Sequence, residues 1–261
     1  MTATWRTDFA SAAPFAHLSP WLGRLLGPDW PELAQLNACA TDRNLRNTLG
    51  LPVQFAAQAS SCGQYEYEAG IYTTGQVPSR ECNWHDLFNA LTWLAFPRTK
   101  AALNAVHQSG LRQSGNRDVP SDAATLFDES GLVLVGEDPG LANLLAARRW
   151  REAMLLRRAE WCRFKVYTVG HAVLEKLLIP WPGITAKCLY LEMRPDTSLD
   201  ALDEVIAQRW RDYDLVRPVA MFPLPVLGIP GWWPEHEQTM LYSDQRYFRP
   251  PRILSGRVAR P

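Results

Sequence analysis

The sequence has no excess of charge of either sign and no apolar run as long as a membrane-spanning helix. Lysine plus arginine number 27, as do aspartate plus glutamate, in a chain of 261 residues. A neutral chain has no overall positive field to attract nucleic acid or anionic lipid, and a span needs about 20 consecutive apolar residues. We therefore expect no membrane association, and the charge balance argues against nucleic acid as a partner.

The sequence also lacks paired cysteines and a secretory leader. Its five cysteines are widely spaced, odd in number and without a CxxC pair, which argues against a disulfide framework and a cysteine zinc knuckle. Polar residues and prolines interrupt the N-terminal 26 residues, so they do not resemble a signal peptide. We expect a cytoplasmic protein with reduced thiols. Cys82 is the candidate for a cysteine nucleophile, although a structural thiol is the simpler interpretation.

No nucleotide-binding loop, complete zinc signature, familiar catalytic motif or internal repeat is present. A hydrophobic content of 47% is sufficient for one substantial core. Irregularly alternating strand and helix patterns predict an α+β fold, a single compact domain with helices packed on a small mixed or antiparallel sheet. Within it we expect a helical N-terminal part (1–52), an α+β core carrying the site (53–217) and a wrapping arm rich in proline and aromatic residues (218–261).

Local patterns predict the individual elements. We expect an N-terminal helix capped by Asp29, strands and loop over residues 53–79, a loop over 113–121, and a strand, tight turn and strand in TLFDESGLVLVG. A helix over 141–157, a strand in RFKVYTVG, a short helix in HAVLEKLLI, a strand over 188–193 and a helix in LDALDEVIAQRW follow.

The most informative stretch is RECNWHDLFNALTWLAFPRTKAALNAVH, where polar residues recur at helical spacing in two apolar helices separated at Pro97. Asn83 is a natural N-cap, which favours a structural role for Asp86 in the first turn. The first helix carries a polar strip of His85, Asn89 and Thr92, and the second one of Lys100, Asn104 and His107. We expect the two strips to face a shared cleft.

Several of these residues have chemical roles that fit their positions. His85 is a candidate general base or metal ligand. The alternative is a structural histidine at the edge of the helix's apolar face, with its hydrogen bonds made within the protein. Asn89 and Asn104 could donate hydrogen bonds to a substrate. Arg98 and Lys100 lie where free backbone N–H groups already favour an anion, although they could also be ordinary solvated cations.

A second group follows the predicted strand at Gly170. His171 and Glu175 lie one helical turn apart, so that Glu175 could orient the imidazole for base catalysis or metal binding. The alternative is a purely structural role, in which His171 and Glu175 hydrogen-bond each other at the start of the helix. Asp128 and Glu129 have the composition of a hairpin turn. Mixed nitrogen and oxygen ligands suit a divalent transition metal, and its candidate ligands are His85, His107, His171, Asp122 and Asp128.

From about residue 65 to 252 the chain resembles an uncharacterised bacterial family known only as a domain of unknown function. The resemblance rests on VPSRECNWHDLFNALTWLAFPRTKAALN, DAATLFDESG, VGHAVLEKL and YFRPPR. It implies family membership and assigns no activity, cofactor or catalytic residue.

The leading functional hypothesis is a cytoplasmic hydrolase or transferase that acts on a small anionic metabolite, with phosphorylated compounds among the candidates. His85, His171 and Glu175 would be catalytic, and Asn89, Arg98, Lys100 and Asn104 would bind the substrate. The alternative is a binding protein whose partner surface contains Trp232, Trp233 and YFRPPR. RNA contact through the arginines of residues 148–158 is a third, weaker hypothesis.

Overall fold

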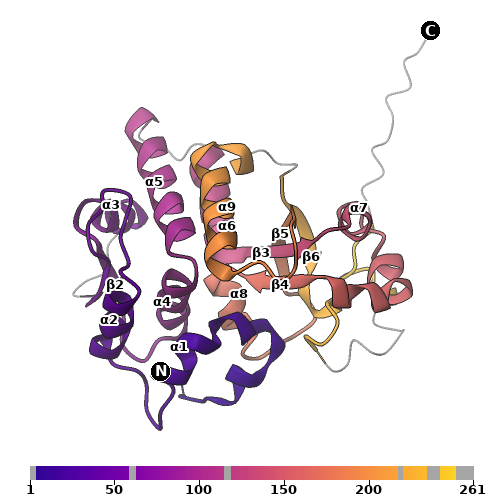
Figure 1. The fold of residues 1–261 in the computed structure, drawn as a ribbon, viewed down its shortest axis with the longest axis horizontal. Coiled ribbons are helices and arrows are strands. Elements are labelled where there is room, and N and C mark those ends of the chain that lie inside the picture. Colours follow the sequence, from indigo (N-terminus) through magenta and orange to yellow (C-terminus); the bar gives the residue numbers. More distant parts are fainter. Residues whose placement is uncertain (1–3, 59–62, 115–118, 217–219, 234–241, 251–261) are drawn as a thin grey trace.

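A four-stranded mixed sheet forms the framework of the C-terminal part of the chain in this computed structural model, which describes residues 4–58, 63–114, 119–216, 220–233 and 242–250 (Figure 1). The strands are β3 (Gly131–Gly136), β4 (Lys165–Thr168), β5 (Thr185–Glu192) and β6 (Phe222–Pro225), in the order β4-β3-β5-β6. β3 is parallel to β5, whereas β4 and β6 are antiparallel to their neighbours. All six residues of GLVLVG in β3 are buried, as an apolar run in a central strand should be.

Helices form the rest of this part. They are α6 (Val119–Ser130), α7 (Pro139–Ala146), α8 (His171–Lys176) and α9 (Leu199–Arg211), with shorter helical segments at Arg151–Leu156, Arg158–Arg163, Asp214–Val216 and Val226–Gly228.

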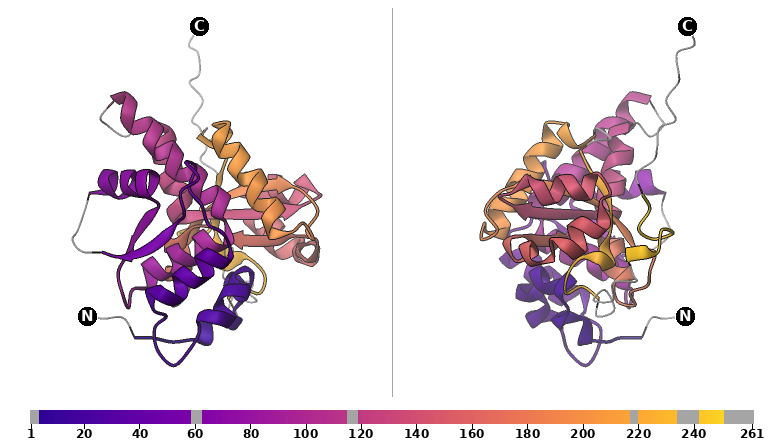
Figure 2. Two further views of the ribbon diagram at one scale, coloured as in Figure 1. Left: turned by 60° about the vertical axis from the view of Figure 1, so that its left-hand side comes forward. Right: turned by 90° about the vertical axis from the view of Figure 1, so that its right-hand side faces the viewer.

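The N-terminal part is largely helical and lies beside the sheet-containing part, with its segment Ala13–Leu18 in contact with β4 (Figures 1 and 2). It begins with 3-10 helices at Asp8–Ser11 and Ala13–Leu18, followed by α1 (Ser19–Leu25) and α2 (Leu33–Asp42). Next come β1 (Gln54–Ala57), α3 (Gln64–Thr74), β2 (Gln76–Ser79), α4 (Trp84–Ala95) and α5 (Pro97–Ser114). β1 and β2 form a separate parallel pair.

One apolar core connects the two parts, because buried side chains extend from Phe9 to Phe248. The predicted α+β class and the single compact domain are therefore confirmed. Among the described residues, no helix combines the length and the apolar character needed to cross a membrane.

Three local predictions near the site and the N-terminus are wrong. The aromatic residues 64–74 form helix α3 rather than a strand, because Glu66 accepts from the Gly63 N–H at its start and Gly75 ends it at φ 75°. TLFDES is the end of helix α6 rather than a strand and turn. The N-cap of α2 is Glu32 rather than Asp29, and the side chain of Gln35 accepts a hydrogen bond from the Glu32 backbone N–H.

Two further differences lie elsewhere in the chain. The helix predicted over 141–157 is interrupted after Ala146, where Arg148 has a φ of 56°. The loop predicted over 113–121 overlaps α5 and α6, and its residues 115–118 lie outside the described part.

The C-terminal arm packs inward and completes the sheet rather than only wrapping it. It supplies β6, and Tyr247 donates a hydrogen bond to the Ile184 carbonyl at 2.8 Å. Tyr247 and Phe248 of YFRPPR are buried, whereas Trp232 and Trp233 are partly buried. Residues 217–219, 234–241 and 251–261 lie outside the described part.

The turn between β4 and α8 is attached to the start of β3. The Gly131 carbonyl accepts hydrogen bonds from the N–H groups of Val169 at 3.0 Å and Gly170 at 2.8 Å. These bonds place the first residue of α8 beside the last turn of α6. A Cβ at Gly170 would lie 2.5 Å from the Gly131 nitrogen and 2.6 Å from the Ser130 Cα, so only glycine fits without movement of the backbone.

The substitution Gly170→Ala should therefore lower the free energy of unfolding by about 1 to 3 kcal/mol, because the close contacts are with backbone atoms. Gly23→Ala in α1 is the matched control, since no atom lies within 4 Å of its added Cβ. Thermal unfolding should show a lower midpoint for Gly170→Ala and an equal or higher one for Gly23→Ala. Equal midpoints for the two variants would contradict this role of Gly170.

Candidate functional site

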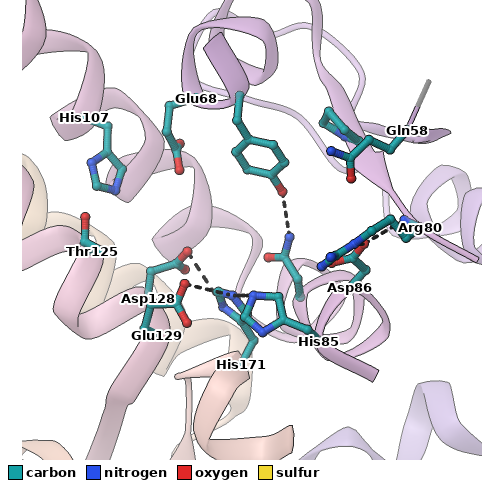
Figure 3. Close-up of a pocket in the computed structure, with 13 residues that line it drawn as sticks. Gln58, Glu68, Arg80, His85, Asp86, His107, Thr125, Asp128, Glu129 and His171 are labelled. Atoms are coloured by element: carbon teal, nitrogen blue, oxygen red, sulfur yellow. Dashed lines mark hydrogen bonds and ion pairs between the residues drawn. The ribbon is translucent and has the colours of Figure 1, made fainter. Parts of the chain in front are cut away.

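A cavity of about 310 Å³ opens where α3, α4, α5, α6 and α8 meet. Figure 3 shows the imidazoles of His85 and His171 side by side, with Asp128 and Glu129 on one side and Arg80 and Asp86 on the other. The residues that line the cavity are mostly polar: Gln58, Tyr67, Glu68, Pro78, Arg80, His85, Asp86, Asn89, His107, Thr125, Asp128, Glu129 and His171.

The two histidines come from helix starts that the chain fixes locally. Asn83 caps α4 by accepting a hydrogen bond from the Asp86 N–H at 3.0 Å, which confirms the predicted cap, and His85 lies in the first turn. His171 is the first residue of α8, directly after the turn anchored on Gly131. The two candidate catalytic histidines thus lie side by side. Glu175, which was expected to orient His171, faces His85 instead, and the role of these residues stays a prediction.

Each imidazole has one nitrogen facing a carboxylate and the other facing the second imidazole. His85 Nδ1 lies 3.1 Å from Glu175 Oε2, and His171 Nδ1 lies 3.8 Å from Asp128 Oδ2. The two Nε2 atoms are 3.0 Å apart. Glu175 favours the Nδ1–H tautomer of His85, which leaves its Nε2 lone pair for a ligand or for a hydrogen bond from His171 Nε2, whereas His171 Nδ1 has no hydrogen-bond partner among the described residues. With both rings in that tautomer, the two lone pairs would point at each other unless a cation lay between them.

A third ligand is close to this pair. Glu129 Oε1 lies 3.6 Å from His171 Nε2, and His85, Glu129 and His171 can each offer one ligand atom within 4.8 Å of the other two. A zinc ion with metal–nitrogen bonds of about 2.0–2.1 Å separates neighbouring ligand nitrogens by about 3.3 Å. The observed Nε2 spacing needs only a small adjustment to accept such an ion. Two histidines and one carboxylate also leave coordination positions for water or substrate.

Burial keeps the inner histidine neutral. The His171 side chain is 5% exposed, and burial lowers its pKa to about 3 despite the nearby Asp128. At neutral pH its ring is therefore in the protonation state that binds metal. Burial raises the pKa of Glu129, although its side chain is 40% exposed and the nearby His85 and Lys100 act in the opposite direction.

Lys100 supplies the charge that holds Asp128. Its Nζ lies 2.5 Å from Asp128 Oδ1, and the two side chains are 6% and 15% exposed. Burial alone would raise the pKa of Asp128, but Lys100 and His171 keep it below its usual value. Lys100, which the sequence placed in a substrate clamp, thus binds the carboxylate that faces His171.

The other residues of the predicted second strip also face the cavity or its lining. Asn104 Nδ2 donates to Glu68 Oε2 at 2.7 Å and to the Glu68 carbonyl at 2.9 Å. His107 lines the cavity, and its Nδ1 lies 3.0 Å from the Ser121 hydroxyl. Of the two predicted strips, His85, Asn89 and His107 line the cavity, whereas Thr92, Lys100 and Asn104 are buried and do not line it.

Two predicted residues lie elsewhere. The anion at the start of α5 is Asp203 of α9, which accepts from the N–H groups of Arg98 at 2.9 Å and Thr99 at 2.8 Å. The Arg98 side chain pairs with Glu204 at 3.0 Å. Asp122 lies in the first turn of α6 and is not among the residues that line the cavity.

Arg80 brings a positive charge to the cavity that the sequence did not indicate. Its Nε and Nη2 donate to Asp86 at 2.8 and 2.9 Å, and its side chain is 54% exposed. The predicted structural role of Asp86 is confirmed, because this carboxylate also accepts from the Arg80 N–H at 2.7 Å.

Glu68 and Glu129 were missed as site residues because their helices were predicted as strand and turn. The signals were present in the sequence. Gly63, Glu66 and Gly75 have the spacing of a helix with capped ends, and the run from Pro120 to Ser130 contains no helix breaker after its first turn.

Loss of the Lys100 charge should destabilise the fold strongly. Lys100→Met leaves Asp128 buried without its cation, and we expect the free energy of unfolding to fall by about 3 kcal/mol. Adding Asp128→Asn should restore part of this loss, and Lys165→Met at an exposed position should have little effect. Denaturant unfolding measures all four proteins. The expectation fails if Lys100→Met is as stable as Lys165→Met.

The neutral state of His171 predicts a pH dependence in the metal-free protein. Between its lowered pKa of about 3 and the ordinary value of about 6.5, the unfolded chain binds a proton that the folded chain does not. His171 therefore reduces stability as pH falls, by up to about 1.4 kcal/mol per pH unit. With chelator present, unfolding free energies from pH 6 to pH 4 should fall more steeply for the wild type than for His171→Gln. Parallel curves would contradict a buried neutral His171.

Comparisons with known proteins place the chain in a family without assigning a function. A family model matches residues 53–252, a range that contains every residue lining the cavity. Comparison with curated proteins and with solved structures gives no match. The chain belongs to the family described as "Protein of unknown function (DUF3025)".

Proposed function

We propose that the protein is a metal-dependent hydrolase whose divalent ion is bound by His85, His171 and Glu129. The observation that carries this proposal is the pair of Nε2 atoms 3.0 Å apart, each on a ring whose Nδ1 faces a carboxylate. A carboxylate behind a histidine is the usual outer partner in metal sites, because it fixes the tautomer and the ring orientation. Glu175 has this position behind His85, and Asp128 lies 3.8 Å from His171 Nδ1, where a small movement would bring it into hydrogen-bond distance.

The proposed ion supplies a Lewis acid and lowers the pKa of bound water to about 7. His85, with a side chain 31% exposed, is the ligand nearer to solvent, whereas His171 is buried. The open coordination positions therefore face the cavity, where water and substrate can enter. Zinc fits two histidines and one glutamate in hydrolases. The predicted transferase alternative would use the same ion with another nucleophile.

The size and charge of the cavity support a small substrate. Its volume of about 310 Å³ lies at the lower end of ligand pockets. Arg80 is the arginine that lines it, and we assign to Arg80 the binding of an anionic group on the substrate. We place this activity in the cytoplasm, since within the described residues the cysteines are free thiols.

Metal content tests the proposal. Protein purified without chelator, or reconstituted with Zn²⁺, should hold about one ion per chain. The variants His85→Ala, His171→Ala and Glu129→Ala should lose it, because each removes one of three ligands. Elemental analysis after desalting measures the stoichiometry. His17→Gln is the control, since His17 bonds the Thr168 carbonyl away from the cavity and should keep the ion.

Replacing a carboxylate that bonds a metal ligand should reduce zinc affinity less than replacing the ligand itself. Glu175→Gln should weaken zinc binding by about 10- to 100-fold without abolishing it. The proposal would be contradicted if the wild type bound no stoichiometric metal. It would also be contradicted if the variant with all three ligands replaced by alanine (His85, His171 and Glu129) bound zinc as well as the wild type. Hydrolysis of ester and amide substrates by the zinc-loaded wild type, and its loss in His85→Ala, tests the reaction class.

A further inference from the structure

The cavity wall away from the two histidines contains a buried carboxylate without a cation of its own. Figure 3 shows Glu68 and His107 on this side. Glu68 is 9% exposed, and one of its oxygens accepts from Asn104. Lys100, the nearest buried cation on α5, is paired with Asp128. Among the described residues, no lysine, arginine or histidine forms an ion pair with Glu68 within 4.0 Å; burial raises the pKa of its carboxyl, and the nearby His107 and Lys100 offset this only in part.

Such a carboxylate is costly unless a donor approaches it. A carboxylate offers about four lone-pair sites, and the contact with Asn104 uses one of them. Asn104 fixes the side chain by bonding both its carboxylate and its backbone carbonyl. Glu68 is thus held in place with spare acceptor capacity toward the cavity that it lines.

Asn89 provides a second unfilled acceptor on the cavity lining. Its Nδ2 donates to the Tyr67 hydroxyl at 2.9 Å, whereas its Oδ1 is buried and has no hydrogen-bond partner in the described part of the chain. The residue is 7% exposed and lines the cavity. Buried polar atoms are normally satisfied; because this oxygen is itself closed off from solvent, a donor on a ligand reaches it only when the Asn89 side chain rotates toward the cavity.

We propose that the substrate carries a primary ammonium group beside its scissile carbonyl, and that Glu68 binds this group. The inference rests on the proposed metal site and names its substrate class: small aminoacyl amides, with an anionic end near Arg80. An ammonium group has three donors and no acceptor, which suits Glu68 with the Asn89 oxygen nearby. In hydrolysis, the oxygen of water bonds to the carbonyl carbon, the C–N bond breaks, and a proton from water passes to the leaving nitrogen.

Hydroxamates test the inference without knowledge of the natural substrate, because they chelate the metal in place of the carbonyl. L-alanine hydroxamate carries the α-ammonium group, whereas acetohydroxamate lacks it. Calorimetric titration of zinc-loaded protein should show the alanine compound binding on the order of tenfold tighter, as expected for a charge-assisted hydrogen bond. N-acetyl-alanine hydroxamate, whose amine is blocked, should lose this advantage.

The variant Glu68→Gln should abolish the preference for the amine and leave acetohydroxamate binding within about twofold of wild type. Glutamine keeps an acceptor for Asn104. The two hydroxamates differ in how strongly they chelate zinc, but this difference is the same in the wild type and the variant and therefore cancels when their preferences are compared. Glu66→Gln, at an exposed position of α3, is the matched control and should keep the preference.

The outcomes separate the two proposals. An unchanged preference in folded Glu68→Gln, or equal binding of the blocked and free amines to the wild type, would overturn the amine site and leave the metal site standing. The wild-type comparison decides the matter even if Glu68→Gln does not fold. Failure to bind zinc would overturn both proposals.

Discussion

The candidate site depends on one backbone interaction, the double hydrogen bond that the Gly131 carbonyl accepts from Val169 and Gly170. It joins the start of the central strand to the turn before α8. Because α6 ends directly before β3, the same contact brings Asp128 and Glu129 to His171. Gly170 permits this approach, since a Cβ there would meet backbone atoms. Two carboxylates and a histidine that are distant in sequence are thereby placed on a rigid frame.

The polar groups of the cavity divide into those that are satisfied and those that are not. Asp86 is paired with Arg80, and Asp128 with Lys100. Glu68 is buried without an ion pair within 4.0 Å among the described residues, and the Nδ1 of His171 is buried without a hydrogen-bond partner there. Buried charges that lack partners reduce stability, and natural proteins retain them mainly where a ligand supplies the compensation. The distribution of unpaired groups, rather than the number of polar residues, distinguishes this cavity as a site.

Sequence patterns predicted the helices that carry His85 and His171, because their caps and apolar faces are local signals. Asn83 and Pro97 mark helix ends through their own side chains. Helical spacing predicted two polar strips, and one or two residues of each line the cavity, namely His85, Asn89 and His107. The patterns could not predict that Asp203 would occupy the start of α5, since that contact joins residues more than 100 positions apart. They also misplaced Glu129, because the composition of DESG suits a turn as well as a helix end.

The account depends on a metal ion bound by two imidazoles and one carboxylate. X-ray absorption spectroscopy at the zinc edge of the loaded protein is the most direct measurement of that coordination. The account predicts two imidazole nitrogens at about 2.0–2.1 Å, completed by oxygen ligands and without sulfur. Sulfur scattering at about 2.3 Å, or a first shell without imidazole, would contradict it.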